Sequence, residues 1–192
     1  MTDAPAPPLR EDRSASMAAA NLYALVLLGP VVVALGALFW WRWGARPMLD
    51  ALIETPVAVQ LALLLGGVIA HEGLHGLAWR LASGKRWGAI RLGFQLKTLT
   101  PYAHCTEAMP ARAYRIGAAT PGVALGLAPA LAGIAAGSGG LAAFGLFFLF
   151  AAGGDALILW LLRGVPAGAL VEDHPTRAGC FVRHADDGAG AA

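Results

Sequence analysis

Charged side chains are scarce in this chain of 192 residues: they make up 14% of it, whereas hydrophobic residues make up 57%. A soluble domain carries about 25% charged residues, so this composition excludes an ordinary water-soluble globule. Charges are scarcest in four stretches long enough to span a bilayer, at Ala19–Trp41, Pro56–Trp79, Ile116–Gly137 and Leu141–Leu162. We therefore predict an all-α membrane protein with about four transmembrane helices.

The net charge is also low, and histidines and cysteines are few; each of these three observations excludes a kind of protein. The formal net charge is only +2, which is too small to indicate nucleic acid as a partner. The five histidines are too few for a di-iron membrane oxidase. The two cysteines, Cys105 and Cys180, cannot form a disulfide framework, and we expect both to stay reduced in the cytoplasm.

The lysines and arginines are divided unevenly between the two sides of the apolar stretches. With a cytoplasmic N-terminus, twelve of the fourteen lie on the cytoplasmic side, and only Arg42 and Arg46 lie outside. The positive-inside rule thus places both termini of a multi-pass protein in the cytoplasm. Residues 1–18 lack the basic-then-apolar order of a signal peptide. We predict a disordered cytoplasmic tail at 1–18, a four-helix membrane domain at 19–163 and a second cytoplasmic tail at 164–192.

The second apolar stretch carries the polar sequence His71-Glu72-Gly73-Leu74-His75. Helical residues four apart lie one above the other, so both histidines can point at one divalent ion. Glu72 can then flank the ion and reach a bound water without being a ligand, as in H-E-x-x-H zinc metalloproteases. Because each intramembrane charge costs about 2.5–3.5 kcal/mol, a compensating metal is favoured over a polar cluster that is merely tolerated.

A catalytic zinc site usually takes three protein ligands and leaves one position for water. Asp155 is the only charged residue in the fourth stretch. At 1.5 Å per helical residue, Asp155 lies about 12 Å from the cytoplasmic end of its stretch, and His71 and His75 lie about 13 and 7 Å from theirs. Asp155 is therefore the candidate third ligand. Alternatively, it pairs with an arginine or caps a helix broken at Gly153-Gly154.

The loop after the second stretch changes from helical to alternating periodicity. Apolar residues recur at every second position from Ile90 to Leu96, and another extended piece runs from about Leu99 to Cys105. This pattern predicts a β-hairpin between helices two and three. The hairpin could offer its edge to an unfolded substrate strand, or it could be a structural element in the membrane interface.

His104 and the C-terminal segment contain further polar side chains. His104 could bond a substrate carbonyl or the oxyanion, or serve as an alternative ligand, although a lone loop histidine more often does neither. The C-terminal segment offers residues that could suggest a second metal centre: Glu172, Asp173, His174, Cys180 and His184. Their spacing matches no closed zinc pattern, so we predict a solvated tail there.

The H-E-G-L-H motif, the hairpin-like loop and the later aspartate resemble features of site-2-type intramembrane zinc metalloproteases. In size and layout, the chain is similar to the small bacterial family described as "putative zincin peptidase". The similarity covers roughly Pro56–Leu162 and can be extended to the segment Val171-Glu172-Asp173-His174-Pro175. Only Gly153-Gly154 precedes the aspartate where site-2 proteases carry a longer motif. The resemblance implies that His71, His75 and Asp155 bind zinc, that Glu72 is the catalytic acid–base, and that the membrane is a bacterial plasma membrane.

The sequence thus favours a zinc-dependent intramembrane endopeptidase in which Glu72 activates a zinc-bound water and later protonates the leaving amine. Its partners would be the lipid bilayer and a membrane protein or peptide substrate, and no oligomeric state is predicted. One alternative is a non-catalytic regulator or assembly factor whose metal has four protein ligands. Another is a metal or proton transporter, which would need polar residues continuing to the outer face of the membrane.

Overall fold

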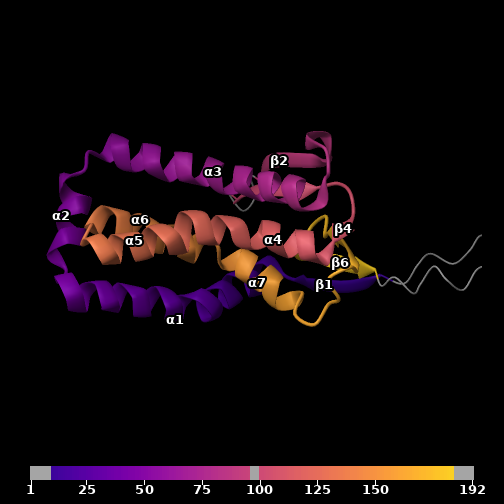
Figure 1. Cartoon of the computed structure of the whole chain (residues 1–192), viewed down its shortest axis with the longest axis horizontal. Helices are drawn as coiled ribbons and strands as arrows, with labels where there is room; N and C mark the ends of the chain where they lie inside the picture. The colour runs from indigo at the N-terminus through magenta and orange to yellow at the C-terminus, as the bar shows by residue number, and fades with distance from the viewer. Residues whose placement is uncertain (1–9, 96–99, 184–192) are drawn as a thin grey trace, which may run out of the picture.

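The computed structural model describes residues 10–95 and 100–183 of the chain. Helices run along the length of the molecule, and two small antiparallel sheets lie at one end of it (Figure 1). The helices are α1 (Met17–Trp43), α2 (Arg46–Glu54), α3 (Val57–Ser83), α4 (Ala111–Pro121), α5 (Ala128–Ala136), α6 (Gly139–Ala151) and α7 (Gly153–Leu161), with a 3-10 turn at Trp87–Ala89. The strands are β1 (Glu11–Ala15), β2 (Ile90–Gln95), β3 (Thr100–Cys105), β4 (Met109–Pro110), β5 (Leu170–Asp173) and β6 (Ala178–Arg183).

Three helical segments of the described chain are long and apolar enough to cross a membrane. They are residues 19–43 of α1, the whole of α3, and the continuous rod from Ala111 to Ala136 that joins α4, a π-helical segment (Gly122–Leu127) and α5. Helices α6 and α7 are bent by 44° and provide a fourth span if they are counted together. The mainly helical prediction is therefore confirmed in its coarse form.

The helices extend beyond the apolar stretches seen in the sequence. Helix α3 continues from Trp79 to Ser83 and ends where Gly84 adopts the left-handed conformation with φ of 70°. The third span begins at Ala111 instead of Ile116. These extra turns contain Arg80, Arg112 and Arg115, which hydropathy alone excludes from a span. The nine-residue helix α2, which links α1 to α3 and contacts α6, was not expected at all.

A four-stranded antiparallel sheet corrects the all-α prediction. Its strand order is β1-β6-β5-β4, so it joins the two chain segments that we expected to be tails, at 1–18 and 164–192. Strand β1 pairs with β6 through a register that matches Glu11 with Val182. Partners this far apart in the sequence leave no local signal of their pairing, and for that reason the sheet was missed. The residues of the tails outside 10–183 are not described.

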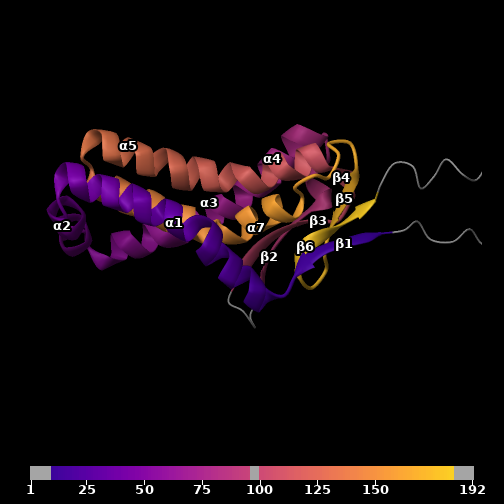
Figure 2. The ribbon, with the colours of Figure 1, turned by 90° about the horizontal axis from the view of Figure 1, so that it is seen from below.

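The hairpin prediction is confirmed. Strands β2 and β3 form a separate two-stranded antiparallel sheet in which Ile90 faces Cys105 and Leu92 faces Ala103. The hairpin contacts α3, mainly through β3. Figure 2 shows both strands beside the end of the helical bundle that carries the larger sheet.

The largest buried core lies where the four-stranded sheet meets the helices. Val171, Cys180 and Val182 alternate toward it from β5 and β6, and Trp79 and Tyr114 enter it from α3 and α4. A smaller cluster around Phe39, Ile134 and Ala142 holds the other end of the bundle together. The four-stranded sheet thus packs as one unit with the C-terminal ends of α3 and α7 and the N-terminal end of α4.

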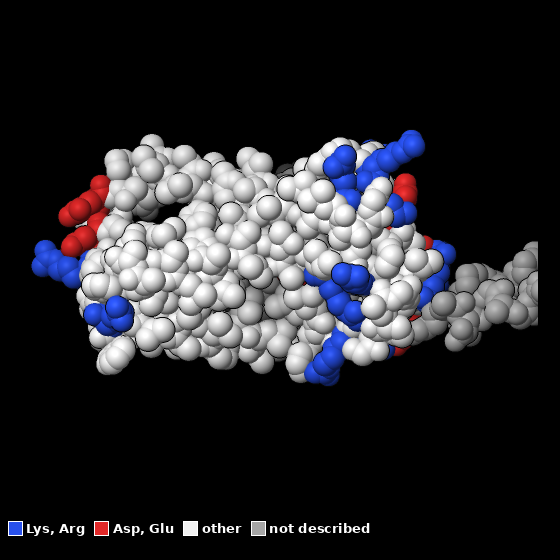
Figure 3. All heavy atoms as spheres, viewed as in Figure 1, with Lys and Arg blue, Asp and Glu red and all other residues white. Residues whose placement is uncertain are grey.

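On the face seen in Figure 3, charged side chains lie at the two ends of the molecule and leave an uncharged band between them. Figure 3 shows lysines and arginines gathered mainly at the end that carries the sheets, with fewer at the opposite end. Such a distribution is typical of a protein whose central band lies in lipid. It agrees with the uneven division of basic residues in the sequence, whereas the orientation in a particular membrane stays a prediction.

Candidate metal centre

The two histidines of the H-E-x-x-H motif lie on one face of α3. Their ring centroids are 4.9 Å apart, and both side chains are buried, with exposed fractions of 9% for His71 and 6% for His75. Four residues make slightly more than one helical turn, so this close approach follows from the motif once α3 forms.

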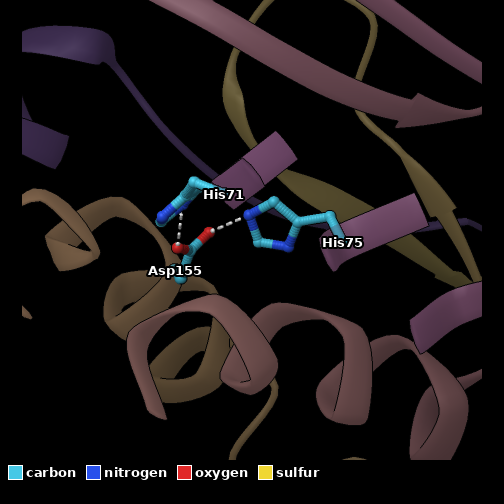
Figure 4. Close-up of side chains that lie close together, drawn as sticks. All are labelled: His71, His75 and Asp155. Carbon is cyan, nitrogen blue, oxygen red and sulfur yellow. Dashed lines mark hydrogen bonds and ion pairs between the residues drawn. The ribbon is translucent and has the colours of Figure 1, made fainter. Parts of the chain in front are cut away.

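Asp155 completes a group of three side chains. It lies in the first turn of α7, just after the bend at Ala152, where the positive end of the helix dipole favours an acid. Its Oδ2 atom is 3.1 Å from Nε2 of His71, and its Oδ1 atom is 3.2 Å from Nε2 of His75 (Figure 4). The structure therefore brings together the three residues that we predicted as ligands, although α3 and α7 lie far apart in the sequence.

The spacing of these three side chains fits a divalent metal. Their candidate ligand atoms all lie within 4.8 Å of one another. Two ligands of a tetrahedral zinc ion, each about 2.0–2.1 Å from the metal, stand about 3.3 Å apart, close to the two measured nitrogen–oxygen separations. Two imidazoles and one carboxylate also match the donor set of catalytic zinc sites, which keep one position free of protein ligands.

The other ring nitrogen of His75 has a fixed partner. Its Nδ1 atom lies 3.0 Å from the backbone oxygen of Gly117 on α4. A carbonyl oxygen can only accept, so Nδ1 donates, and Nε2 is the ring nitrogen left to bind a metal. Gly117 allows this contact because a side chain at that position would collide with the indole of Trp79. The importance of Gly117 was not foreseen, since a single glycine in a helix gives no sequence signal.

Glu72 stands beside the three-residue group and is not a member of it. Its partly buried side chain interacts electrostatically with both histidines and with Asp155. The backbone of Ala103 on β3 lies near the Glu72 carboxylate. The carboxylate is therefore placed between the prospective ligands and the edge of the hairpin, as the sequence analysis expected of a residue that flanks the metal.

His104 does not join the metal group. Its Nδ1 atom lies 3.1 Å from Oδ2 of Asp173, and the side chain is about one-third exposed. In the described chain, the residues named as a potential second centre form no group with metal-ligand geometry, and His184 lies outside the described residues. Cys105 and Cys180 are both free and buried. Burial raises the pKa of the Cys180 thiol to about 12, so this side chain is neutral and unreactive.

We expect the Asp173–His104 pair to make folding stability depend on pH. The carboxylate of Asp173 raises the pKa of His104 above its usual 6.5, against an opposing effect of burial. A histidine whose pKa is raised in the folded state stabilises the fold below its unfolded pKa, and this stabilisation is lost as the pH rises through the folded value. The melting-temperature advantage of the wild type over a His104→Gln variant should therefore shrink between about pH 6 and pH 8. A difference that stays constant across this interval would contradict the prediction.

Comparisons with known proteins bear on the same part of the chain. The sequence model of a family described as "putative zincin peptidase" matches residues 64–170, which is more than half of the chain and includes the H-E-G-L-H motif, the hairpin and Asp155. No curated protein and no solved structure matches the chain.

Proposed function

Because the chain belongs to the family described as "putative zincin peptidase", we propose that it is a zinc-dependent endopeptidase that cuts membrane-associated proteins within the membrane. The observation that carries this proposal is the approach of Asp155 to His71 and His75, at distances that suit one tetrahedral ion. His71, His75 and Asp155 would hold the zinc, and Glu72 would be the catalytic acid–base.

Each residue around the site would have a separate task. When bound, zinc supplies a Lewis acid that lowers the pKa of water to about 7 and polarises the scissile carbonyl. Glu72 takes the proton of the attacking water and later delivers it to the leaving nitrogen. Gly117 holds His75 in the orientation that a ligand needs. Beside Glu72, the outward-facing carbonyl groups of β3 could accept hydrogen bonds from an extended substrate, because the Ala103 and Cys105 amides already face carboxylates.

The surface of α3 supports a membrane segment as the substrate. On a helix, Val57 and Leu61 lie on the same face as His71 and His75, because positions 57, 61, 64, 68, 71 and 75 follow one another at intervals of three or four residues. Their exposed fractions are 71% for Val57 and 52% for Leu61, whereas the histidines are buried. The face that carries the prospective ligands is thus uncovered in the first turns of α3. There, an apolar segment can reach the site from lipid.

The two alternative functions have less support. A purely structural metal would have four protein ligands, but three side chains form the metal group in the described chain, and His104 is engaged by Asp173. A transporter would need polar residues leading away from the site. The helix α1 and the rod formed by α4 and α5 offer almost none in their apolar stretches.

Metal removal tests the proposal directly. Purified protein in detergent should cleave a fluorescent single-span membrane peptide, and treatment with a zinc chelator should abolish the cleavage. Added zinc should restore the cleavage. Cleavage that persists after complete removal of metal, as measured by elemental analysis, would exclude a zinc-dependent reaction.

A further inference from the structure

Asp173 joins three groups that belong to different elements. It ends β5, three residues beyond the part of the chain that matches the family. Its Oδ2 atom accepts a hydrogen bond of 2.7 Å from the backbone amide of Cys105 and lies 3.1 Å from Nδ1 of His104. Its Oδ1 atom accepts a hydrogen bond from the hydroxyl of Tyr114 on α4. The side chain is only 10% exposed, so these contacts replace water almost entirely.

The contact with Cys105 sets the position of the hairpin edge. Amides two residues apart on a strand point to the same edge, so the amides of Ala103 and Cys105 both face away from β2. The first of these lies near Glu72, and the second donates to Asp173. Asp173 thus holds the strand edge at a point about 7 Å from the residue that lies beside Glu72. Displacement of Cys105 would move Ala103 relative to Glu72.

The contact with Tyr114 connects Asp173 to a metal-site histidine. The Tyr114 ring stacks on Trp79 with centroids 5.7 Å apart, and Trp79 stacks on His75 with centroids 5.5 Å apart. The Trp79 indole also donates to the backbone oxygen of Tyr114. A continuous row of packed rings therefore runs from Asp173 to His75, and one carboxylate contacts both this row and β3.

We propose that Asp173 is a positioning residue of the peptidase site, which fixes the β3 edge against Glu72 and the ring row against His75. This inference rests on the proposed function. A carboxylate suits this position because its two charged oxygens can accept from all three groups, whereas an asparagine offers one neutral oxygen. Removal of the charge should loosen β3 without removing any metal-site residue.

A comparison of Asp173→Asn with Glu172→Gln tests the proposal. Glu172 precedes Asp173 on β5 and pairs with Arg10 and Arg183, so its substitution also removes a sheet carboxylate but leaves the hairpin contacts intact. We expect Asp173→Asn to lower kcat by about 10–100-fold, with little change in KM or zinc content, and Glu172→Gln to retain wild-type kcat. An equal kcat in the two variants would overturn the proposal.

Two further measurements separate positioning from general damage. Tyr114→Phe removes one of the three contacts and should lower kcat less than Asp173→Asn does. The double variant should be no slower than Asp173→Asn alone, because both changes act through the same carboxylate. If the fold-losses in kcat of the two single variants multiplied in the double variant, the two residues would not act through the same carboxylate.

Amide hydrogen exchange provides a readout that does not depend on cleavage. Peptides covering residues 101–105 should exchange faster in Asp173→Asn than in Glu172→Gln, because a neutral amide oxygen is a weaker acceptor for the Cys105 N–H than a carboxylate. Equal exchange would overturn the inference even in a chain without peptidase activity. Conversely, zinc-dependent cleavage that survives Asp173→Asn unchanged would leave the proposed function intact and reject only the role of Asp173.

Discussion

Replacing Glu72 with glutamine should slow cleavage severely while leaving zinc bound. Glutamine has nearly the same shape as glutamate, but it cannot take a proton from water. Removal of a general base typically lowers the rate by about 10²–10⁴-fold. We therefore expect a fall of that size in kcat, measured with the single-span substrate, and a zinc content equal to that of the wild type. Full activity in this variant would eliminate Glu72 as the acid–base.

Glu107→Gln provides the matched control for this experiment. Glu107 is an exposed carboxylate that pairs with Lys85 at 2.8 Å, outside the metal site. An exposed ion pair of this kind contributes about 0–1 kcal/mol, so its loss should leave both kcat and zinc content near the wild-type values. If the two variants lost activity equally, the effect of Glu72 would reflect general disturbance of the protein.

Replacing Asp155 with asparagine should weaken zinc binding strongly. The neutral amide is a poor zinc ligand, and its NH2 group would face a histidine nitrogen in place of a carboxylate oxygen. Second-shell changes alone reduce metal affinity by about 10–100-fold, so loss of one of three direct ligands should cost at least 100-fold. Zinc content after dialysis and the dissociation constant from a competition assay measure this effect. A His71/His75 double alanine variant should bind no zinc at the site.

Thermal unfolding gives a second measure of the same prediction. A ligand that binds only the folded protein stabilises it by about 2.7 kcal/mol at a free concentration of 100 Kd. Added zinc should raise the melting temperature of metal-free wild-type protein and leave that of Asp155→Asn nearly unchanged. Asp50→Asn, which alters an exposed acid paired with Arg46 on α2, should respond to zinc as the wild type does. An undiminished zinc response in Asp155→Asn would remove this residue from the ligand set.

The residues on α3 and in the hairpin show how far local pattern reaches. The spacing of His71 and His75 predicted their common face, since a helical turn brings positions four apart together. Alternation from Ile90 onward predicted a strand, and the following extended piece predicted its partner only a few residues away. The depth estimate also placed Asp155 level with the histidines. However, it could not predict the 44° bend between α6 and α7, at which the helix carrying this acid begins.

Asp173 shows where local pattern ends. Its neighbours Cys105 and Tyr114 come from two other elements, and the strand that carries it is held by β6, which in turn pairs with β1 near the N-terminus. From the sequence, an acid in a short polar segment is predicted to be solvated. The structure shows partners around Asp173 that the sequence does not indicate. The same reason explains why the sheet formed by β1, β4, β5 and β6 was missed.

By itself, the sequence determined the apolar helices, the paired histidines with their adjacent glutamate, and the hairpin, because helical and strand periodicities are properties of contiguous residues. The tertiary structure alone decided that Asp155 meets both histidines, that Gly117 orients one of them, and that Asp173 links the hairpin to the ring row. These contacts join residues that lie 42 to 84 positions apart in the sequence and belong to different elements. Only the packing of the folded chain brings them within bonding distance.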